Sequence, residues 1–306
     1  MSQFTGVAVL VPCLNEAVVI SQVVEQLLTI LPGSIVYVYD NNSDDDTINE
    51  ALKAGAIVRS EPMRGKGNVV RRMFADIEAD IYVMLDGDGT YEIGAAPAMI
   101  SLLKANQLDL VTGKRVDEDM KSSTYRRGHR LGNRLFTSSL RRIFNSNCED
   151  VLSGYRVMSR RFVKSFPTVS RGFEIEVEMT AHASLLRVPT GEKQTMYRER
   201  PANSFSKLNT YSDGLRIARS LFRIFRSYSP SRFFGTISIL MSLISIPFFY
   251  QHFSQSNSSS SNQLIVGLIF ATLSALILSV GIVLNAVSRL RTESLRLVYL
   301  SIPFAS

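Results

Sequence analysis

A long stretch without charge is the feature that most constrains how this chain can fold. From Phe233 to Ser288 the 306-residue sequence has no Asp, Glu, Lys or Arg, although charged residues are spread over the chain before it and return at Arg289. Two apolar runs, Phe233 to Phe253 and Leu264 to Val287, have about the 20-residue length that a helix needs to cross a bilayer. The pattern predicts two transmembrane helices. The alternative is a buried helical hairpin of a soluble protein.

The flanks of these runs predict a hairpin with both ends in the cytoplasm. The connection from Ser254 to Asn262 is a Ser/Asn run without Lys or Arg. The flanking arginines are Arg219, Arg223, Arg226 and Arg232 before the hairpin, and Arg289, Arg291 and Arg296 after it. Because cytoplasmic flanks of membrane helices are enriched in Lys and Arg, both ends are assigned to the cytoplasm. Pro247 is expected to kink the first helix or to end it early.

The segment before the hairpin predicts a helix that lies on the membrane surface. Its apolar residues repeat at helical spacing, and its arginines fall on another face. That basic face suits acidic headgroups or one phosphorylated lipid, and the sequence does not choose between them. The predicted division is a cytosolic domain at 1–208, a juxtamembrane amphipathic helix at 209–232, two transmembrane helices at 233–288 and a cytosolic tail at 289–306.

The first 208 residues alternate between strand-like and helix-like patterns. Apolar runs predict strands at Val7–Val11, Ser34–Tyr39, Ala56–Arg59 and Ile81–Leu85, and a helical pattern covers Lys66–Ile77. Apolar residues from Ile20 to Leu31 repeat at the spacing of a first helix, for which Asn15 is the expected N-cap. A short second helix is expected to be capped within Asp44–Asp46 and to end at Gly55. This alternation is typical of an α/β fold with a mostly parallel sheet covered by helices.

Three polar loops follow predicted strands, at Pro12–Glu16, Asp40–Asp46 and Asp86–Tyr91. Ligands of such sheets bind beyond the carboxyl ends of the strands, so the loops are expected to share one edge. Asp86 and Asp88 flank a glycine, and two carboxylates so placed suit Mg²⁺ or Mn²⁺. Taken alone, the pair is more typical of a capped turn, and its position directly after the strand predicted at Ile81–Leu85 favours the metal site.

Several other classes of function are disfavoured. The turn after the first strand is not Gly-rich, which argues against a dinucleotide site. Arg64-Gly65-Lys66-Gly67 opens a helix and suits phosphate, but it lacks Walker spacing and also fits an ordinary turn. The net charge of +7 suits anionic partners, yet the basic residues cluster toward the hairpin, which disfavours nucleic acid. Cys13 and Cys148 have no zinc or disulfide pattern and predict two reduced thiols.

An ordered set of motifs runs through most of the chain. The motifs are VPCLNE at 11–16, DNNSDDDT at 40–47, RGKGN at 64–68, LDGDGTY at 85–91, VTGKR at 111–115, EDVLSGYRV at 149–157 and RPANSFSKLNTY at 200–211. At these residues the sequence resembles family 2 glycosyltransferases of the GT-A fold. Within that family it is similar to the polyprenyl-phosphate glycosyltransferases, which include dolichol-phosphate mannose synthase and bacterial undecaprenyl-phosphate glucosyltransferases.

The resemblance implies a donor site for a nucleotide-sugar. Its implied residues are Pro12, Leu14, Glu16, Asp40, Arg64, Lys66, Asp86, Gly87 and Asp88. Asp86 and Asp88 would hold the metal, and Arg200 and Lys207 would close over the diphosphate as catalytic groups together with Asp88. Several relatives carry a metal-assisting Gln two residues after the second Asp, where this chain has Thr90.

The resemblance also implies an acceptor side that binds a lipid phosphate. The basic residues expected there are Lys114, Arg115, Arg126, Arg127 and Arg130, and a solvated basic helix near an anionic membrane is the alternative for the later ones. Asp150 would face the acceptor as a further catalytic residue, where it would act as a base or orient Arg residues or the sugar. A structural cap for the turn before Gly154 is the other reading of Asp150.

The predicted activity is inverting transfer of a hexose from a nucleotide-sugar, with UDP-glucose as the working donor, to undecaprenyl or dolichyl phosphate. The product would supply cell-envelope glycan or O-antigen modification from the cytoplasmic face of a bacterial inner membrane. The alternatives are a family 2 transferase with a carbohydrate acceptor and a membrane-tethered nucleotide-binding scaffold. Processive relatives carry a Gln-x-x-Arg-Trp motif, and this chain has no Trp. The oligomeric state is open, and a homo-oligomer is compatible with the small residues of the spans.

Overall fold

The computed structural model describes residues 6–117, 148–172, 174–198, 222, 225, 226, 229–254 and 260–304. The chain divides into two compact units. The first comprises Met1–Gly214 together with Leu295–Ser306, and the second comprises Leu215–Ser294. Most of the amphipathic helix predicted at 209–232 falls outside the described residues.

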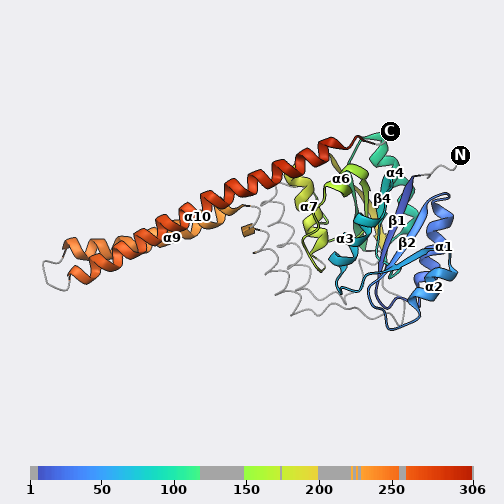
Figure 1. Cartoon of the computed structure of the whole chain (residues 1–306), viewed down its shortest axis with the longest axis horizontal. Coiled ribbons are helices and arrows are strands. Elements are labelled where there is room, and N and C mark those ends of the chain that lie inside the picture. The colour runs from blue at the N-terminus through green and yellow to red at the C-terminus, as the bar shows by residue number, and fades with distance from the viewer. Residues whose placement is uncertain are drawn as a thin grey trace. The chain divides into compact units, whose positions relative to one another are not determined.

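A seven-stranded sheet forms the centre of the first unit (Figure 1), in the order β3-β2-β1-β4-β6-β5-β7. The strands are β1 (Val7–Cys13), β2 (Ile35–Asp40), β3 (Ile57–Ser60), β4 (Ile81–Met84), β5 (Leu110–Asp117), β6 (Arg156–Ser159) and β7 (Thr190–Tyr197). Among the described strands, only β6 runs antiparallel to its neighbours, β4 and β5. The other pairs are parallel, which confirms the predicted mostly parallel sheet.

Helices cover both faces of this sheet, with α1 and α2 on one side and α3 and α7 on the other (Figure 1). The helices are α1 (Ile20–Ile30), α2 (Thr47–Lys53), α3 (Lys66–Asp76), the 3-10 turn η1 (Ile93–Ala95), α4 (Ala96–Ala105), α6 (Arg160–Ser165) and α7 (Ile175–Leu186). Val9 and Val11 of β1 pack with Leu27 of α1, whereas Leu10 packs with Met73 of α3. Because both faces are buried, the strand is continuously apolar in sequence.

The start of α1 differs from the sequence expectation, which placed the cap at Asn15. The helix begins at Ile20, its N-cap position is Val19, and Asn15 adopts a left-handed φ of 53°. The Asn15 Oδ1 accepts a hydrogen bond from the backbone amide of Asp44 instead (2.8 Å). Its side chain therefore joins two loops, and the capping prediction is wrong. Gly55, with φ of 96°, follows α2 as predicted.

The C-terminal residues are an integral part of the first unit. Helix α10 (Ser260–Ser301) continues through the predicted boundary at residues 288 and 289. Near its end the Tyr299 hydroxyl donates to Oδ2 of the fully buried Asp109 (2.6 Å). Arg161 donates to both oxygens of Asp109 at 2.5 and 2.7 Å, and its guanidinium lies 4.8 Å from the Tyr299 ring centre and 5.0 Å from that of Phe304. These contacts anchor the end of the chain to the sheet.

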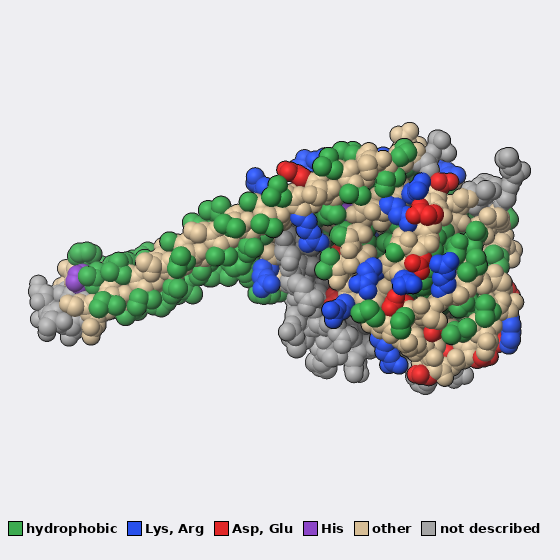
Figure 2. All heavy atoms as spheres, in the orientation of Figure 1, with side chains coloured by type: hydrophobic (Ala, Val, Ile, Leu, Met, Phe, Trp, Pro, Cys, Tyr) green, Lys and Arg blue, Asp and Glu red, His purple; other side chains and the backbone are tan. Residues whose placement is uncertain are grey.

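Helix α9 (Pro230–Ser254) and most of α10 form the second unit, and both are long and apolar enough to cross a membrane by length and composition. Apolar side chains cover the surface of both helices in Figure 2, in agreement with their exposure. Pro247 lies inside α9, so the helix does not end there. Ser238 and Ser274 each donate to the other's carbonyl oxygen (3.0 and 2.9 Å), which joins the two helices.

The anchor at Asp109 makes a stability prediction. Replacing Tyr299 by Phe removes the hydroxyl donor from a buried carboxylate, and we expect the free energy of unfolding of the first unit to fall by about 1–3 kcal/mol. Thermal unfolding of the full chain in detergent measures this change. The control is Tyr37→Phe, because within the described residues the Tyr37 hydroxyl makes no hydrogen bond. An unchanged melting temperature for Tyr299→Phe would contradict the anchoring role.

Candidate active site

Hydrogen bonds join the first two polar loops directly. The backbone amide of Asn15 donates to Ser43 Oγ (2.8 Å), and that of Glu16 donates to Thr47 Oγ1 (2.9 Å). The amide of Ala17 donates to Asp45 Oδ2 (3.1 Å). The loop after β1 is thus fastened to the loop after β2, as expected for the carboxyl ends of adjacent parallel strands.

Gly87 brings the third loop against the same strand end. A Cβ at this position would lie 2.5 Å from Cys13 Sγ and 3.2 Å from Val11 Cγ1, so any larger residue would displace the loop from β1. The three loops therefore meet at one edge of the sheet, which confirms the expectation from sequence. This close approach accounts for the glycine between Asp86 and Asp88.

A buried lysine neutralises part of the acidic edge. Lys66 Nζ lies 2.5 Å from Asp86 Oδ1 and 2.5 Å from Glu176 Oε1. The side chains of Lys66 and Glu176 are 8% and 5% exposed, whereas that of Asp86 is 30% exposed. Burial by itself lowers the pKa of Lys66, but the charges of Asp86 and Glu176 outweigh burial and raise that pKa. Lys66 therefore remains a cation, with one partner facing solvent.

The turn before Lys66 is built for close packing. A Cβ on Gly65 would overlap the carbonyl oxygen of Arg171, and one on Gly67 would overlap that of Ser170. Gly65 also has a φ of 124°, a conformation that side chains disfavour. The two glycines thus let the start of α3 lie against residues 170 and 171, with Lys66 directed into the site.

Asp88 is held by Thr90, the residue two positions after it in the sequence. Asp88 is 4% exposed and Thr90 is 1% exposed. The Thr90 hydroxyl donates to Asp88 Oδ1 (2.6 Å), and the Thr90 amide donates to the same oxygen (3.1 Å). Thr90 therefore orients the Asp88 carboxylate.

Asp150 and Arg115 form a two-pronged ion pair. Arg115 Nε lies 2.7 Å from Asp150 Oδ2, and Nη2 lies 2.8 Å from Oδ1. The Arg115 amide also donates to Oδ2 (3.1 Å). Burial raises the pKa of Asp150, but the hydrogen bonds from Arg115 outweigh burial, and the pKa lies below its usual value. With both oxygens engaged, the carboxylate is arranged to orient Arg115 and poorly arranged to accept a proton.

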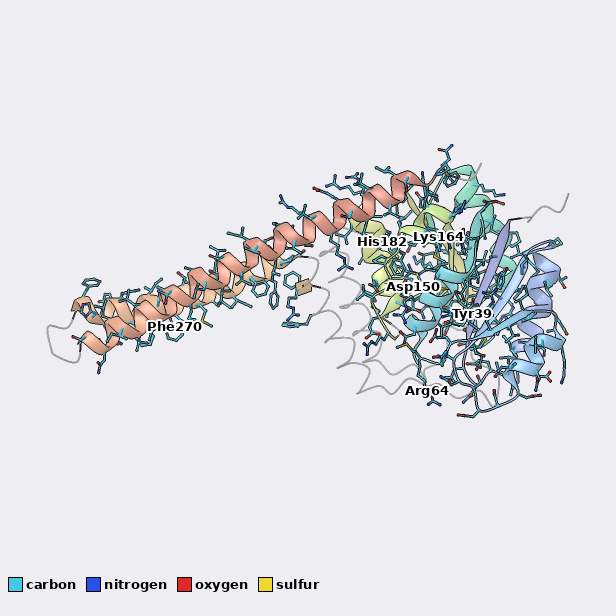
Figure 3. All side chains as sticks on the ribbon, viewed as in Figure 1. Tyr39, Arg64, Asp150, Lys164, His182 and Phe270 are labelled. Atoms are coloured by element: carbon cyan, nitrogen blue, oxygen red, sulfur yellow. The ribbon has the colours of Figure 1, made fainter. Side chains whose placement is uncertain are left out.

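The residues expected around the nucleoside differ in exposure. Asp40 is 2% exposed, and its Oδ2 and Oδ1 accept hydrogen bonds from the Ser43 amide at 3.1 and 3.3 Å. Glu16 is also buried, whereas Pro12 and Leu14 are half-buried. Arg64 is 69% exposed and lies 4.0 Å from Asp44. Figure 3 shows Arg64 at the rim of the first unit and Asp150 within it.

The remaining predicted site residues are only partly described. Lys114 pairs with Glu149. Arg126, Arg127, Arg130, Arg200 and Lys207 lie outside the described residues. The part of the site that can be traced thus combines Lys66, Asp86, Asp88, Arg115 and Asp150.

Sequence reasoning missed two contributors to this site. Glu176, in the first turn of α7, pairs with Lys66, and the Tyr91 hydroxyl accepts the amide of Gly154 (2.8 Å). A Cβ on Gly154 would lie 2.8 Å from Asp86 Oδ2 and 3.0 Å from Lys66 Nζ, so this backbone borders the ion pair. The available signal was a carboxylate at every second position from Glu174 in an otherwise apolar segment.

The donor set fits a divalent cation that is shared with a substrate. Within the described ranges no group of three or more His, Cys, Asp and Glu side chains could hold a metal ion. Mg²⁺ is commonly bound through one or two carboxylates together with substrate phosphates and water, and not by a full protein cage. Asp86 and Asp88 would be those carboxylates, and Asp86 is partly open to solvent.

Comparisons with known proteins agree on a family. The model described as "Glycosyl transferase family 2" matches residues 8–166. Glycosyltransferase AglJ of Haloferax volcanii is 34% identical over 233 residues, which cover 76% of this chain and 76% of that protein. Protein RfbJ of Shigella flexneri is 52% identical over 125 residues, which cover 41% of this chain and 96% of that protein. A dolichyl-phosphate hexose transferase of Haloferax volcanii is 25% identical over 222 residues, which cover 72% of this chain and 94% of that protein.

Solved structures support the predicted fold. Glucosyl-3-phosphoglycerate synthase from Mycobacterium tuberculosis, in complex with Mn²⁺, UDP-glucose and phosphoglyceric acid, matches with a TM-score of 0.56 and 23% identity. The match covers 72% of this chain and 79% of that one. Together with the family match, this likeness confirms that the first unit has the predicted GT-A fold.

The Asp150–Arg115 pair predicts a pH-dependent contribution to stability. A carboxyl whose pKa is lowered by folding stabilises the protein above its unfolded pKa of about 3.9, and this stabilisation is lost as the pH falls through the lower folded pKa. We expect Asp150→Asn to lower the free energy of unfolding at pH 7, because it leaves Arg115 without its carboxylate partner. The expected loss is only about 1–3 kcal/mol, since Arg115 is partly exposed and solvent screens its charge.

Melting temperatures between pH 7 and pH 3 measure the effect. The gap between the wild type and Asp150→Asn should narrow below about pH 4 as the wild-type carboxylate is protonated. Asp44→Asn is the matched control, because the Asp44 side chain is 82% exposed. A gap of constant size over this range would contradict the ion-pair interpretation.

Proposed function

This chain belongs to glycosyltransferase family 2, and on that premise we propose that it transfers a hexose from a UDP-sugar to a polyprenyl phosphate. Hexosyl transfer from a nucleotide-sugar follows from the family, whereas the acceptor, the nucleobase of the donor and the identity of the hexose are proposed. The observation that carries the proposal is the Arg115–Asp150 pair. Asp150 uses both oxygens to orient a cation, which suits an anionic acceptor better than an alcohol that needs a base.

The donor side must stabilise the charge that develops on the leaving diphosphate. A divalent cation held by Asp86 and Asp88 would neutralise part of that charge without proton transfer. Lys66 stands beside Asp86 as a permanent cation in a buried setting, where a charge acts more strongly than it does in water. Arg200 and Lys207 are proposed to approach the same diphosphate.

The acceptor needs binding more than it needs activation. A phosphate monoester has a second pKa near 6, so it is largely a dianion at neutral pH. Arg115 is proposed to hold this phosphate together with Lys114, Arg126, Arg127 and Arg130. Because Asp150 fixes the guanidinium plane of Arg115, the cation is oriented before the acceptor arrives.

The proposed step is a direct displacement at the anomeric carbon. An oxygen of the lipid phosphate forms a bond to that carbon as the bond to the nucleoside diphosphate breaks. The electron pair of the broken bond leaves on the diphosphate oxygen, and attack from the opposite face inverts the configuration. No proton transfer is needed, in keeping with an Asp150 that is already paired.

Location in the membrane completes the proposal. Helices α9 and α10 have the length and composition of spans, and the arginines that flank them support a catalytic unit on the cytoplasmic side. A similar protein is named a dolichyl-phosphate hexose transferase, which supports a lipid phosphate as acceptor. The product would be a lipid-linked sugar donor for envelope glycan or O-antigen modification at a bacterial inner membrane.

Transfer of label into lipid tests the function. Full-length protein in detergent is incubated with UDP-[14C]glucose, Mn²⁺ and either undecaprenyl or dolichyl phosphate, and the products are extracted into organic solvent. We expect organic-soluble label from wild type, a loss of about 10²–10³-fold in Asp88→Asn, and little change in the exposed control Asp44→Asn. Label found only in a water-soluble glycan would overturn the lipid acceptor.

Metal binding gives a prediction that is independent of turnover. Thr90→Val removes the hydroxyl that orients Asp88, and we expect Mn²⁺ affinity in the presence of UDP to fall by about 10–100-fold. Electron paramagnetic resonance of free Mn²⁺ measures the affinity. Thr29→Val is the control, since the Thr29 hydroxyl bonds only to a carbonyl of its own helix among the described contacts. Equal Mn²⁺ affinity in wild type and Thr90→Val would contradict the assignment of Asp88.

A further inference from the structure

Arg156 is an unusual residue for the middle of a sheet. It opens β6, the strand that lies antiparallel between β4 and β5, and it is the largest fully buried side chain of the described residues. The following strand residues, Val157 and Met158, are apolar core residues. Burying a guanidinium in such a place is unfavourable unless its hydrogen bonds are satisfied.

The guanidinium connects two segments that are distant in sequence. Its Nε donates to the carbonyl of Ser153 (3.0 Å) and its Nη2 to that of Val151 (2.9 Å), both in the turn after Asp150. The same Nη2 lies 2.9 Å from the carbonyl of Glu176 and 3.1 Å from Thr180 Oγ1, both in α7. One side chain thus ties the turn before β6 to the first turns of α7.

Each of these segments carries a carboxylate that holds a site cation. Asp150, directly before the turn, orients Arg115. Glu176, whose own carbonyl accepts Arg156, pairs with Lys66. The turn also leads to Gly154, whose backbone borders the Lys66–Asp86 pair. Movement of either segment would therefore displace one of the two cations relative to the other.

We propose that Arg156 is a positioning residue that fixes the Lys66–Glu176 pair and the Arg115–Asp150 pair relative to each other. Under the proposed function, on which this naming rests, these pairs are the donor side and the acceptor side of the site. Arg156 would then set the separation between the leaving diphosphate and the attacking phosphate. Neither substrate contacts it, because its side chain is fully buried.

The bonding pattern favours this role over that of a simple structural ion pair. The described partners of Arg156 are three carbonyls and one hydroxyl, and no carboxylate is among them. Its Nη1 has no hydrogen-bond partner within the described residues. A side chain needed only to fill the core would be better apolar, whereas tying a turn to a helix requires several donors in a fixed plane.

Chemical modification of the two cations tests the proposal without any sugar substrate. Full-length wild type, Arg156→Met and Arg156→Lys in detergent are treated with acetic anhydride for lysines or phenylglyoxal for arginines, and the rates at Lys66 and Arg115 are read by mass spectrometry. In Arg156→Met we expect Lys66 to be modified at least about tenfold faster, because the buried amine becomes accessible to the reagent when Glu176 moves away. The modification rate of Arg115 should also rise in Arg156→Met, and both rates should rise less in Arg156→Lys.

Arg161→Met is the matched control. It removes another arginine, in α6 directly after β6, whose carboxylate partner Asp109 lies outside the site. It should lower stability without changing the rates at Lys66 or Arg115, and the exposed Lys53 serves as the internal reference in every sample. If Arg156→Met does not fold, Thr180→Val removes one of the four contacts and keeps the cation, and both rates should still rise.

Unchanged rates at Lys66 and Arg115 in the folded variants would overturn the positioning role, as would acceleration of only one of the two residues. These readouts need neither UDP-glucose nor a lipid phosphate. Failure of the transfer assay would therefore count against the proposed function alone, and failure of the modification assay against Arg156 alone.

Discussion

The salt bridges of Lys66 are the interaction on which the site depends. A buried ammonium with two carboxylates costs less than an isolated buried charge. The charge of Lys66 keeps Asp86, in the loop after β4, close to Glu176, which lies in α7. The two glycines beside Lys66 allow the approach of residues 170 and 171, which precede α7. The position of α7, and with it Glu176, is thereby linked to the start of α3.

A second pair repeats this arrangement on the other side of β6. Arg115 donates two hydrogen bonds to Asp150, and the Asp150 carboxylate thereby orients the guanidinium. Each half of the site therefore has one cation and at least one carboxylate that holds it. Under the proposed function, preorganised charges of this kind would favour a reaction between two anionic substrates, because little reorganisation is needed when the substrates arrive. Under the proposed function, Asp88, which Thr90 orients, would hold the metal together with Asp86.

Much of the fold could be predicted because its signals are local. The apolar run of β1, the helical spacing of α1 and the glycine after α2 each reflect the conformation of a few neighbouring residues, and the meeting of three loops follows from parallel strand order. Asn15 shows the limit of this reasoning. Its type is typical of a helix cap, but a hydrogen bond to Asp44, contributed by another loop, outweighed the local preference.

The sequence by itself determined the acidic edge at Asp86 and Asp88, the family motifs and the two apolar helices, because these are short-range patterns or compositional features. Only the tertiary structure decided that Glu176 pairs with Lys66, that Asp150 is occupied by Arg115, that Arg156 ties their segments together and that Tyr299 anchors the chain end at Asp109. The physical reason is that each of these contacts joins side chains far apart in sequence. Their meeting depends on how strands and helices pack, and no local pattern records it.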